Sequence, residues 1–229
     1  MKNRYDDKLR KGNQLIIKLT PANQTLRIIL ALEIQKAFLK NKNLQVLELG
    51  CGEGDALNYI LEFNSNLKVD ALDISQEMIK ISKGNLQKYK ENLNFICKDA
   101  LEYLKESKTY DLVTASWTLH NFNWKNKIEL LKNIFEKLNH GGSLMIMDKI
   151  YTNDSKINKK LFEKQNKRYE YLDEELSKEI VSHEKQDYSD DFIMTENQII
   201  QCLKHIGFSK IRIIDRIERD VVLIGEKYF

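Results

Sequence analysis

Residues 46–54 read Val-Leu-Glu-Leu-Gly-Cys-Gly-Glu-Gly, an apolar run with one glutamate that is followed by three glycines at alternate positions. A short apolar run predicts a buried strand, and the glycines predict a tight turn directly after it. Because glycine has no β-carbon, such a turn lets the backbone approach a ligand closely. The segment therefore predicts a strand, a turn and a helix that open onto a binding site.

Two other glycine patterns bind nucleotides, and the chain departs from both. Gly50 and Gly52 begin a dinucleotide fingerprint of the form Gly-x-Gly-x-x-Gly, but Asp55 stands at the third glycine place. A phosphate loop would need a lysine that this segment lacks. A turn that binds no ligand stays open as a further interpretation.

Beyond residue 44, apolar segments alternate with segments of helical spacing. The expected strands cover residues 44–49, 67–72, 93–96, 111–116 and 143–147. The expected helices cover 55–62, the stretch from the capping residue Ser75 to Tyr89, and 124–138, which a left-handed glycine of the pair Gly141-Gly142 is expected to end. Residues 99–104 are expected to form a short helix or a turn. This alternation favours a parallel sheet with helices on both faces.

The remaining segments are expected to extend this arrangement within one domain of residues 1–229. Residues 1–43 predict a basic leader with a helix from about Asn23 to Lys40, and residues 151–194 predict a helical lid. In that lid, six apolar residues share one helix face: Ile157, Leu161, Tyr169, Leu172, Leu176 and Ile180. Thr195 and Gln198 predict a capping box for a helix that ends at Gly207, and residues 210–219 and 221–225 predict an antiparallel strand pair.

Composition narrows the chemical context. The formal net charge of +3 gives no strong basic excess, so nucleic acid is not expected as a partner. The three cysteines have neither zinc spacing nor the pattern of a disulfide framework, so we expect no metal and a reducing, cytoplasmic location. The N-terminus lacks the apolar segment of a signal peptide, and no apolar stretch reaches about 18 residues, so no membrane association is expected. A homodimer is one assembly that the sequence permits.

Ligands of open parallel sheets bind beyond the carboxyl ends of the strands. Asp73 ends the second expected strand, where its carboxylate can accept both hydroxyls of a ribose; capping of the next helix is the alternative, although Ser75 is better placed for it. Asp99 follows the third strand, where it can accept an exocyclic amine of adenine or cap a helix, and the sequence supports both equally.

Several residues at this edge are apolar or aromatic. Ile74 and Met78 could enclose an adenine ring, although a methionine at helical spacing is more often part of a core. Ser116 and Trp117 close the fourth strand and are expected to face the same cleft.

Taken together, these segments resemble the class I S-adenosylmethionine (SAM) dependent methyltransferases. The resemblance covers about residues 44–149, where Glu48 to Gly54, Asp73, Asp99-Ala100, the 111–116 strand and the Leu138-x-x-Gly-Gly turn follow the order of that family. It implies a Rossmann-like α/β fold, with a seven-stranded, mostly parallel sheet whose last strand is antiparallel, and SAM as cofactor. The implied cofactor-binding residues are Glu48, Gly50, Cys51, Gly52, Asp73, Ile74, Met78, Asp99, Ala100, Ser116 and Trp117.

The expected activity is transfer of the SAM methyl group to a small-molecule acceptor. His120, just past the fourth strand, is the candidate catalytic base and acceptor contact, while a loop histidine bonded to backbone is an equal interpretation. Tyr151 and Tyr169 are the remaining candidate acceptor-binding residues, and packing between sheet and lid is an equally open role for them.

A narrower resemblance links three segments to carboxy-SAM synthase, a tRNA-modification enzyme of this fold. These are the Tyr5-Asp6-Asp7 leader, the insertion after Asp148-Lys149, and residues 194–208. That family pairs an arginine of the insertion with the carboxylate of its product, whereas residues 175–181 here contain no arginine and Arg168 only lies nearby. A SAM-binding subunit without catalysis also fits the sequence, whereas Asp55 disfavours an NAD-dependent oxidoreductase.

Overall fold

The computed structural model describes residues 20–105, 108–172, 174–187 and 193–228. Its centre is a seven-stranded sheet in the order β3-β2-β1-β4-β5-β7-β6. The strands are β1 Val46–Leu49, β2 Val69–Asp73, β3 Leu93–Cys97, β4 Tyr110–Ser116, β5 Leu138–Lys149, β6 Ser209–Ile217 and β7 Asp220–Glu226. Strands β1 to β5 are parallel, and β7 runs antiparallel to both β5 and β6. The expected mostly parallel sheet with an antiparallel last strand is confirmed.

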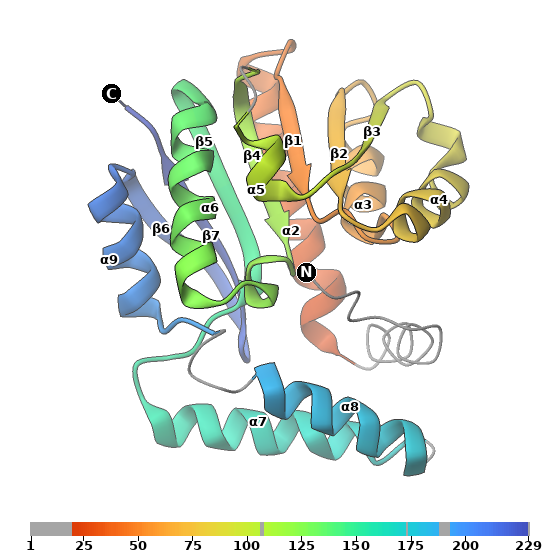
Figure 1. Ribbon diagram of the computed structural model, residues 1–229, viewed down its shortest axis with the longest axis vertical. Helices are drawn as coiled ribbons and strands as arrows, with labels where there is room; N and C mark the ends of the chain where they lie inside the picture. The colour runs from red at the N-terminus through yellow and green to blue at the C-terminus, as the bar shows by residue number, and fades with distance from the viewer. Residues whose placement is uncertain (1–19, 106–107, 173, 188–192, 229) are drawn as a thin grey trace.

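Helices cover both faces of the sheet (Figure 1). One face carries α2 Pro21–Lys40, α3 Asp55–Phe63 and α4 Gln76–Asn85, and the other carries α5 Ala100–Tyr103, α6 Trp124–Lys137 and α9 Glu196–Ile206. Successive side chains of a strand point to opposite faces of the sheet, so each strand contributes to both layers. Val46 packs with the first set of helices and Leu47 with the second. Helix α2 is therefore part of the main core, while residues 1–19 of the expected leader lie outside the described residues.

Helix α4 is shorter than expected. Ser75 caps it by accepting a hydrogen bond from the Met78 amide, as the sequence predicts. The helix ends at Asn85, and a 3₁₀ turn, η1, follows at Gln87–Tyr89. Gly84 and Asn85 are weak helix formers, which accounts for the break.

The expected end of the helix over residues 124–138 is wrong. Helix α6 stops at Lys137, and Leu138 is already extended as the first residue of β5. Gly141 has a φ of 75°, and a β-carbon on Gly142 would lie 2.8 Å from the Asn139 carbonyl oxygen. Glycine is therefore needed at both positions because the first residues of β5 are irregular and closely packed, and neither glycine ends a helix.

The C-terminal predictions are confirmed. Thr195 and Gln198 form a complete capping box at the start of α9, and Gly207 ends that helix with a φ of 120°. The antiparallel pair of β6 and β7 then returns the chain to the sheet.

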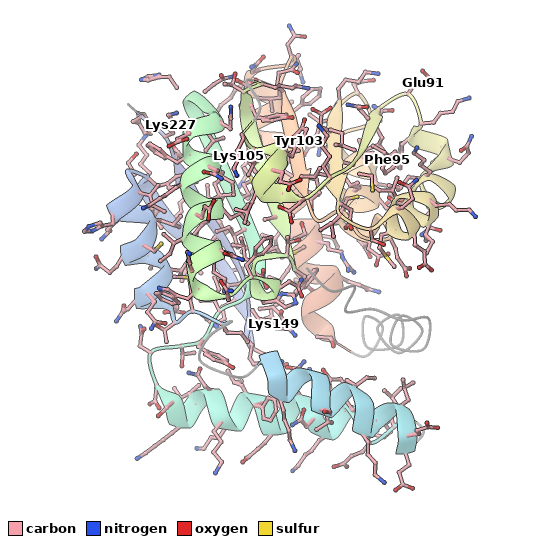
Figure 2. All side chains as sticks on the ribbon, viewed as in Figure 1. Glu91, Phe95, Tyr103, Lys105, Lys149 and Lys227 are labelled. Carbon is pink, nitrogen blue, oxygen red and sulfur yellow. The ribbon has the colours of Figure 1, made fainter. Side chains whose placement is uncertain are left out.

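The lid segment forms two helices, α7 Ser155–Tyr169 and α8 Glu174–Asp187, which lie beyond the edge where the parallel strands end (Figure 1). Lys149, the last residue of β5, marks this edge in Figure 2. Tyr169, Leu176 and Ile180 form a small core of their own between the helices, whereas Ile157 is 46% exposed. The six apolar residues thus do not share one continuous face. None of the described helices has the length and apolar character needed to cross a membrane.

Candidate active site

The sheet brings the glycine loop, the end of β2 and the end of β4 to one edge. Leu49 pairs with Leu72 on one side and with Ala115 on the other, so the residues that follow these three leave the sheet at the same level. Strands β2 and β3 follow β1 towards one side of the sheet, whereas β5 follows β4 towards the other side. The strand order therefore reverses between β1 and β4, and this junction is the switch point of the sheet. Open parallel sheets bind their ligands at that point.

The three glycines of the loop have different reasons to be glycine. All have positive φ, at 68° for Gly50, 52° for Gly52 and 90° for Gly54. A β-carbon on Gly50 would collide with Thr118, and one on Gly54 would collide with Ser82 and Leu86. A β-carbon on Gly52 would meet nothing within 4 Å. Packing therefore accounts for Gly50 and Gly54, and Gly52 is the glycine that faces open space.

Cys51 is buried within the loop. Its amide donates to the Leu72 carbonyl at 2.9 Å, which fixes the loop against β2. Burial, together with the nearby carboxylates of Asp73 and Glu48, raises the pKa of the Cys51 thiol. The thiol is protonated at neutral pH, so a nucleophilic role does not fit this position.

Asp73 holds the loop in place. Its Oδ2 accepts from the Gly52 amide at 2.9 Å, and its Oδ1 accepts from the Ser75 amide at 2.8 Å. Burial raises the pKa of Asp73, and these backbone donors oppose the rise. Each carboxylate oxygen can accept a further hydrogen bond, so Asp73 has the capacity to bind two ribose hydroxyls.

The next residues along this edge suit a flat, apolar group. Ile74 leaves 47% of its surface exposed, and Met78 is half-buried on the first turn of α4. Cys97 pairs with Asp73 across β2 and β3, which puts Asp99 two residues beyond the same edge. Asp99 caps α5, because its Oδ1 accepts from the Leu101 amide at 2.8 Å, and Ala100 is the first residue of that helix. The capping interpretation of Asp99 is thus observed. Open space at Gly52, the Asp73 carboxylate and the exposed Ile74 together fit an adenosine ligand.

Glu48 does not reach the edge. Its side chain is fully buried within β1 and accepts a hydrogen bond from the Thr114 hydroxyl on β4. Burial raises the pKa of Glu48 to about 7, although the Thr114 hydroxyl opposes the rise. This position favours support of the β1–β4 pair over direct contact with a cofactor.

Ser116 and Trp117 end β4 at this edge. Ser116 is buried, and Trp117 adopts a φ of 48°, which is rare for a bulky side chain. The indole Nε1 of Trp117 donates to Asp220 Oδ1 at 2.7 Å, and the guanidinium of Arg27 lies 4.9 Å from the indole ring. These contacts hold the indole ring in place while the backbone of Trp117 keeps its strained conformation.

His120 belongs to the 3₁₀ turn η2, Leu119–Asn121, that follows Trp117. Its Nδ1 lies 2.7 Å from Asp148 Oδ1, and its amide donates to Asp148 Oδ2 at 3.2 Å. Both side chains are buried. The imidazole is thus bonded to a carboxylate, and not to the backbone group that the sequence also permitted.

Asp148 is a site residue that sequence reasoning missed. Burial favours a higher pKa for this carboxyl group, but the neighbouring His120, the Lys149 amide and the Lys127 cation lower the pKa below its ordinary value. An ionised Asp148 accepts from Nδ1–H and leaves Nε2 of His120 as the basic nitrogen. The sequence carries a signal for it, since Asp148 stands at the end of the fifth strand as Asp73 stands at the end of the second.

The two tyrosines are not brought together with His120 by any described contact. Tyr151 is buried and bridges to Thr195 at the start of α9. Tyr169 is 0% exposed inside the core of the lid, where Gln165 donates to its hydroxyl at 2.6 Å. The position of Tyr169 favours packing over contact with an acceptor.

Comparison with known proteins shows which enzymes this chain resembles. A family model described as a methyltransferase domain matches residues 46–142. A carboxy-S-adenosyl-L-methionine synthase of Nautilia profundicola is 26% identical over 190 residues, which cover 82% of this chain and 78% of that relative. A malonyl-[acyl-carrier protein] O-methyltransferase of Ilyobacter polytropus is 36% identical over 104 residues, which cover 45% of this chain and 37% of the relative.

Among solved structures, the CurJ carbon methyltransferase superposes with a TM-score of 0.69 at 18% identity. The match covers 95% of this chain and 58% of that structure, so the chain spans little more than half of its length. The family match contains the glycine loop, Asp73, Asp99 and His120, which are the residues that line or support the edge described above. Residues 46–142 of the chain thus match a methyltransferase domain, and these similarities support S-adenosylmethionine as the cofactor of a SAM-dependent methyltransferase.

Proposed function

We propose that the protein transfers the methyl group of SAM to a small-molecule acceptor that carries a proton on the reacting atom, and that His120 removes this proton. The buried pair of His120 and Asp148, with 2.7 Å between Nδ1 and Oδ1, is the observation that carries the proposal. Such an acceptor needs a base, because its reacting atom is a weak nucleophile while it holds the proton, and that proton must leave as the bond to the methyl group forms.

The cofactor residues follow from the edge of the sheet. Asp73 accepts the ribose hydroxyls, Gly52 gives the methionine part close access to the backbone, and Ile74 with Met78 covers the adenine. Asp99 and Ala100 contact the adenine edge from the start of α5. When bound, SAM supplies an electrophilic methyl group on a good leaving group, so orientation can account for much of the rate.

His120 and Asp148 act on the acceptor side. The Asp148 carboxylate holds the proton of Nδ1 in place, which leaves the Nε2 lone pair free to take a proton from the acceptor. The imidazolium that forms is stabilised by the same carboxylate at a buried position, where an ion pair is screened little by water. The helical lid formed by residues 151–194 limits the access of water to this side.

Carboxy-SAM synthesis is the second candidate, because a relative of that name aligns with most of the chain. It would need a cation above the sulfonium to pair with the extra carboxylate. Arg168 is the residue that the sequence offers, but its guanidinium makes a two-pronged ion pair with Glu218, with Nη1 2.7 Å from Oε2. An arginine already neutralised in this way supports methyl transfer over carboxy-SAM synthesis.

The experiment incubates the protein with SAM labelled in the methyl group and with a whole cell extract, and then separates the small molecules, RNA and protein of that extract. We expect label in small molecules with the unmodified protein and with His205→Ala, a control on α9 away from this edge, but not with His120→Ala. SAM affinity, measured by calorimetry, should be unchanged in both variants. Label confined to RNA or protein, or full activity of His120→Ala, would contradict the proposal, and a bound nucleoside heavier by one carboxylate would favour the second candidate.

The domain organisation and the location of the protein complete the proposal. We propose that residues 1–229 act as one methyltransferase domain, with α2 as an integral helix and residues 151–194 as its lid. The free cysteines Cys51, Cys97 and Cys202 support a reducing, cytoplasmic location.

A further inference from the structure

Arg27 is a buried cation beside the glycine loop. It lies on the second turn of α2, and its Nη2 is 3.8 Å from Oδ2 of Asp55, the first residue after Gly54. The Arg27 side chain is 6% exposed, whereas the side chain of Asp55 is 49% exposed. The guanidinium also lies 4.9 Å from the ring of Trp117. It is thus enclosed by the two segments that form the cofactor edge, the loop before α3 and the end of β4.

The surroundings of this guanidinium do not complete its hydrogen bonding. A separation of 3.8 Å from Asp55 is longer than a hydrogen bond. Nε of Arg27 is buried without a hydrogen-bond partner among the described residues. Burial lowers the pKa of Arg27, although Asp55 and Tyr59 oppose this effect. A buried charge is costly unless it is paired and hydrogen-bonded, so an anionic ligand at this position would be stabilised.

We propose that Arg27 binds the α-carboxylate of the methionine part of SAM. A guanidinium matches a carboxylate with two parallel hydrogen bonds, and SAM carries one carboxylate, at the end opposite its adenine. Asp73 lies on the β2 side of the glycine loop, whereas Arg27 lies by the start of α3 and by Trp117. An adenosine held by Asp73 would therefore direct the methionine end across Gly52 towards Arg27. The inference rests on SAM as cofactor, and is independent of the acceptor and of His120.

Three ligands separate recognition of the carboxylate from recognition of the adenosine. SAM carries the carboxylate, decarboxylated SAM lacks only that group, and 5′-methylthioadenosine lacks the whole amino acid. Calorimetry with each ligand should show that the unmodified protein prefers SAM to decarboxylated SAM by roughly 10- to 100-fold, the effect of hydrogen bonds to a charged group. Arg27→Met should abolish this preference and leave the affinity for 5′-methylthioadenosine within about threefold.

Two controls and a milder variant accompany the test. Lys36→Met removes a positive charge from an exposed position of the same helix and should change none of the affinities. Asp73→Asn should weaken all three ligands alike. Arg27→Lys keeps the positive charge but loses the planar guanidinium that forms two parallel hydrogen bonds, so it should keep part of the preference for SAM. This variant also tests the proposal if Arg27→Met fails to fold.

Each outcome separates the explanations. Equal weakening of all three ligands by the Arg27 variants would mean that the guanidinium only packs against Trp117, and the proposal would fall. Equal affinity of the unmodified protein for SAM and decarboxylated SAM would also overturn it, while SAM would stand as cofactor. Failure to bind any of the three ligands would instead remove the cofactor on which the inference rests.

Discussion

The Thr118 side chain fills the space that a β-carbon on Gly50 would need, and its hydroxyl donates to the Leu49 carbonyl at 2.9 Å. The first glycine of the loop is therefore set by contact between the ends of β1 and β4. Gly52 has no such neighbour among the described residues and faces open space. Two glycines of one motif thus have separable roles, one in packing and one in ligand access.

Alanine at these positions should affect different properties. Gly50→Ala combines positive φ with a collision against Thr118, and we expect it to lower the free energy of unfolding by about 2–4 kcal/mol. Gly52→Ala has only the conformational cost of about 1–2 kcal/mol. Its β-carbon would enter the ligand side of the loop, so SAM affinity should fall by roughly tenfold or more. Denaturant unfolding and calorimetry measure the two effects, and the same profile for both variants would contradict this division.

Asp148→Asn should separate geometry from charge at His120. The asparagine oxygen can still accept from Nδ1–H, but the negative charge that stabilises the imidazolium is lost. Once an acceptor is identified, we expect Asp148→Asn to lower the kcat of methyl transfer by about 100-fold or more, while the Kd of SAM changes less than about twofold. A stopped assay and calorimetry give the two values. Parallel loss of SAM binding and rate would instead assign Asp148 a purely structural role.

The buried Glu48 makes stability depend on pH. Its pKa is about 7 in the folded protein and near the ordinary 4.5 when unfolded. Between these values the folded state holds a proton that the unfolded chain has released, so stability falls as pH rises through this window. The loss of stability is about 3 kcal/mol and is complete above pH 7. Glu48→Gln should keep an acceptor for Thr114 and flatten the fall, as urea unfolding at about pH 5, 6, 7 and 8 would measure. An unchanged slope would refute the assignment.

The ion pair of Arg168 and Glu218 ties α7 to the turn between β6 and β7. Both side chains are largely buried, and the bonds are two-pronged. Arg168→Met should release this contact and speed hydrogen exchange of amides in residues 155–169 by roughly 10- to 100-fold. Lys159→Met is the matched control, since Lys159 pairs with Glu163 at 4.0 Å on an exposed part of the same helix. Equal exchange in the two variants would show that different contacts hold the lid.

The sequence determined the elements and their order. The glycine loop, the Ser75 cap, the Thr195–Gln198 capping box and the alternation of strands with helices all depend on residues that are neighbours in the chain. Steric limits on φ and the spacing of apolar residues act over a few residues, so they can be read without a structure. The same locality explains the error at Gly141, because a positive φ is required both at a helix end and in an irregular strand start.

The tertiary structure decided which side chains meet. Asp148 is 28 residues from His120, and Arg27 is far from Trp117 in the sequence, so only the order and register of the strands bring each pair together. The burial of Glu48 and Tyr169 likewise depends on what the folded layers place around them. Partners and burial set the charge and the freedom of a side chain, and these are properties of the packed molecule. The chain by itself thus defined the class of site, and the fold selected the residues that can perform its chemistry.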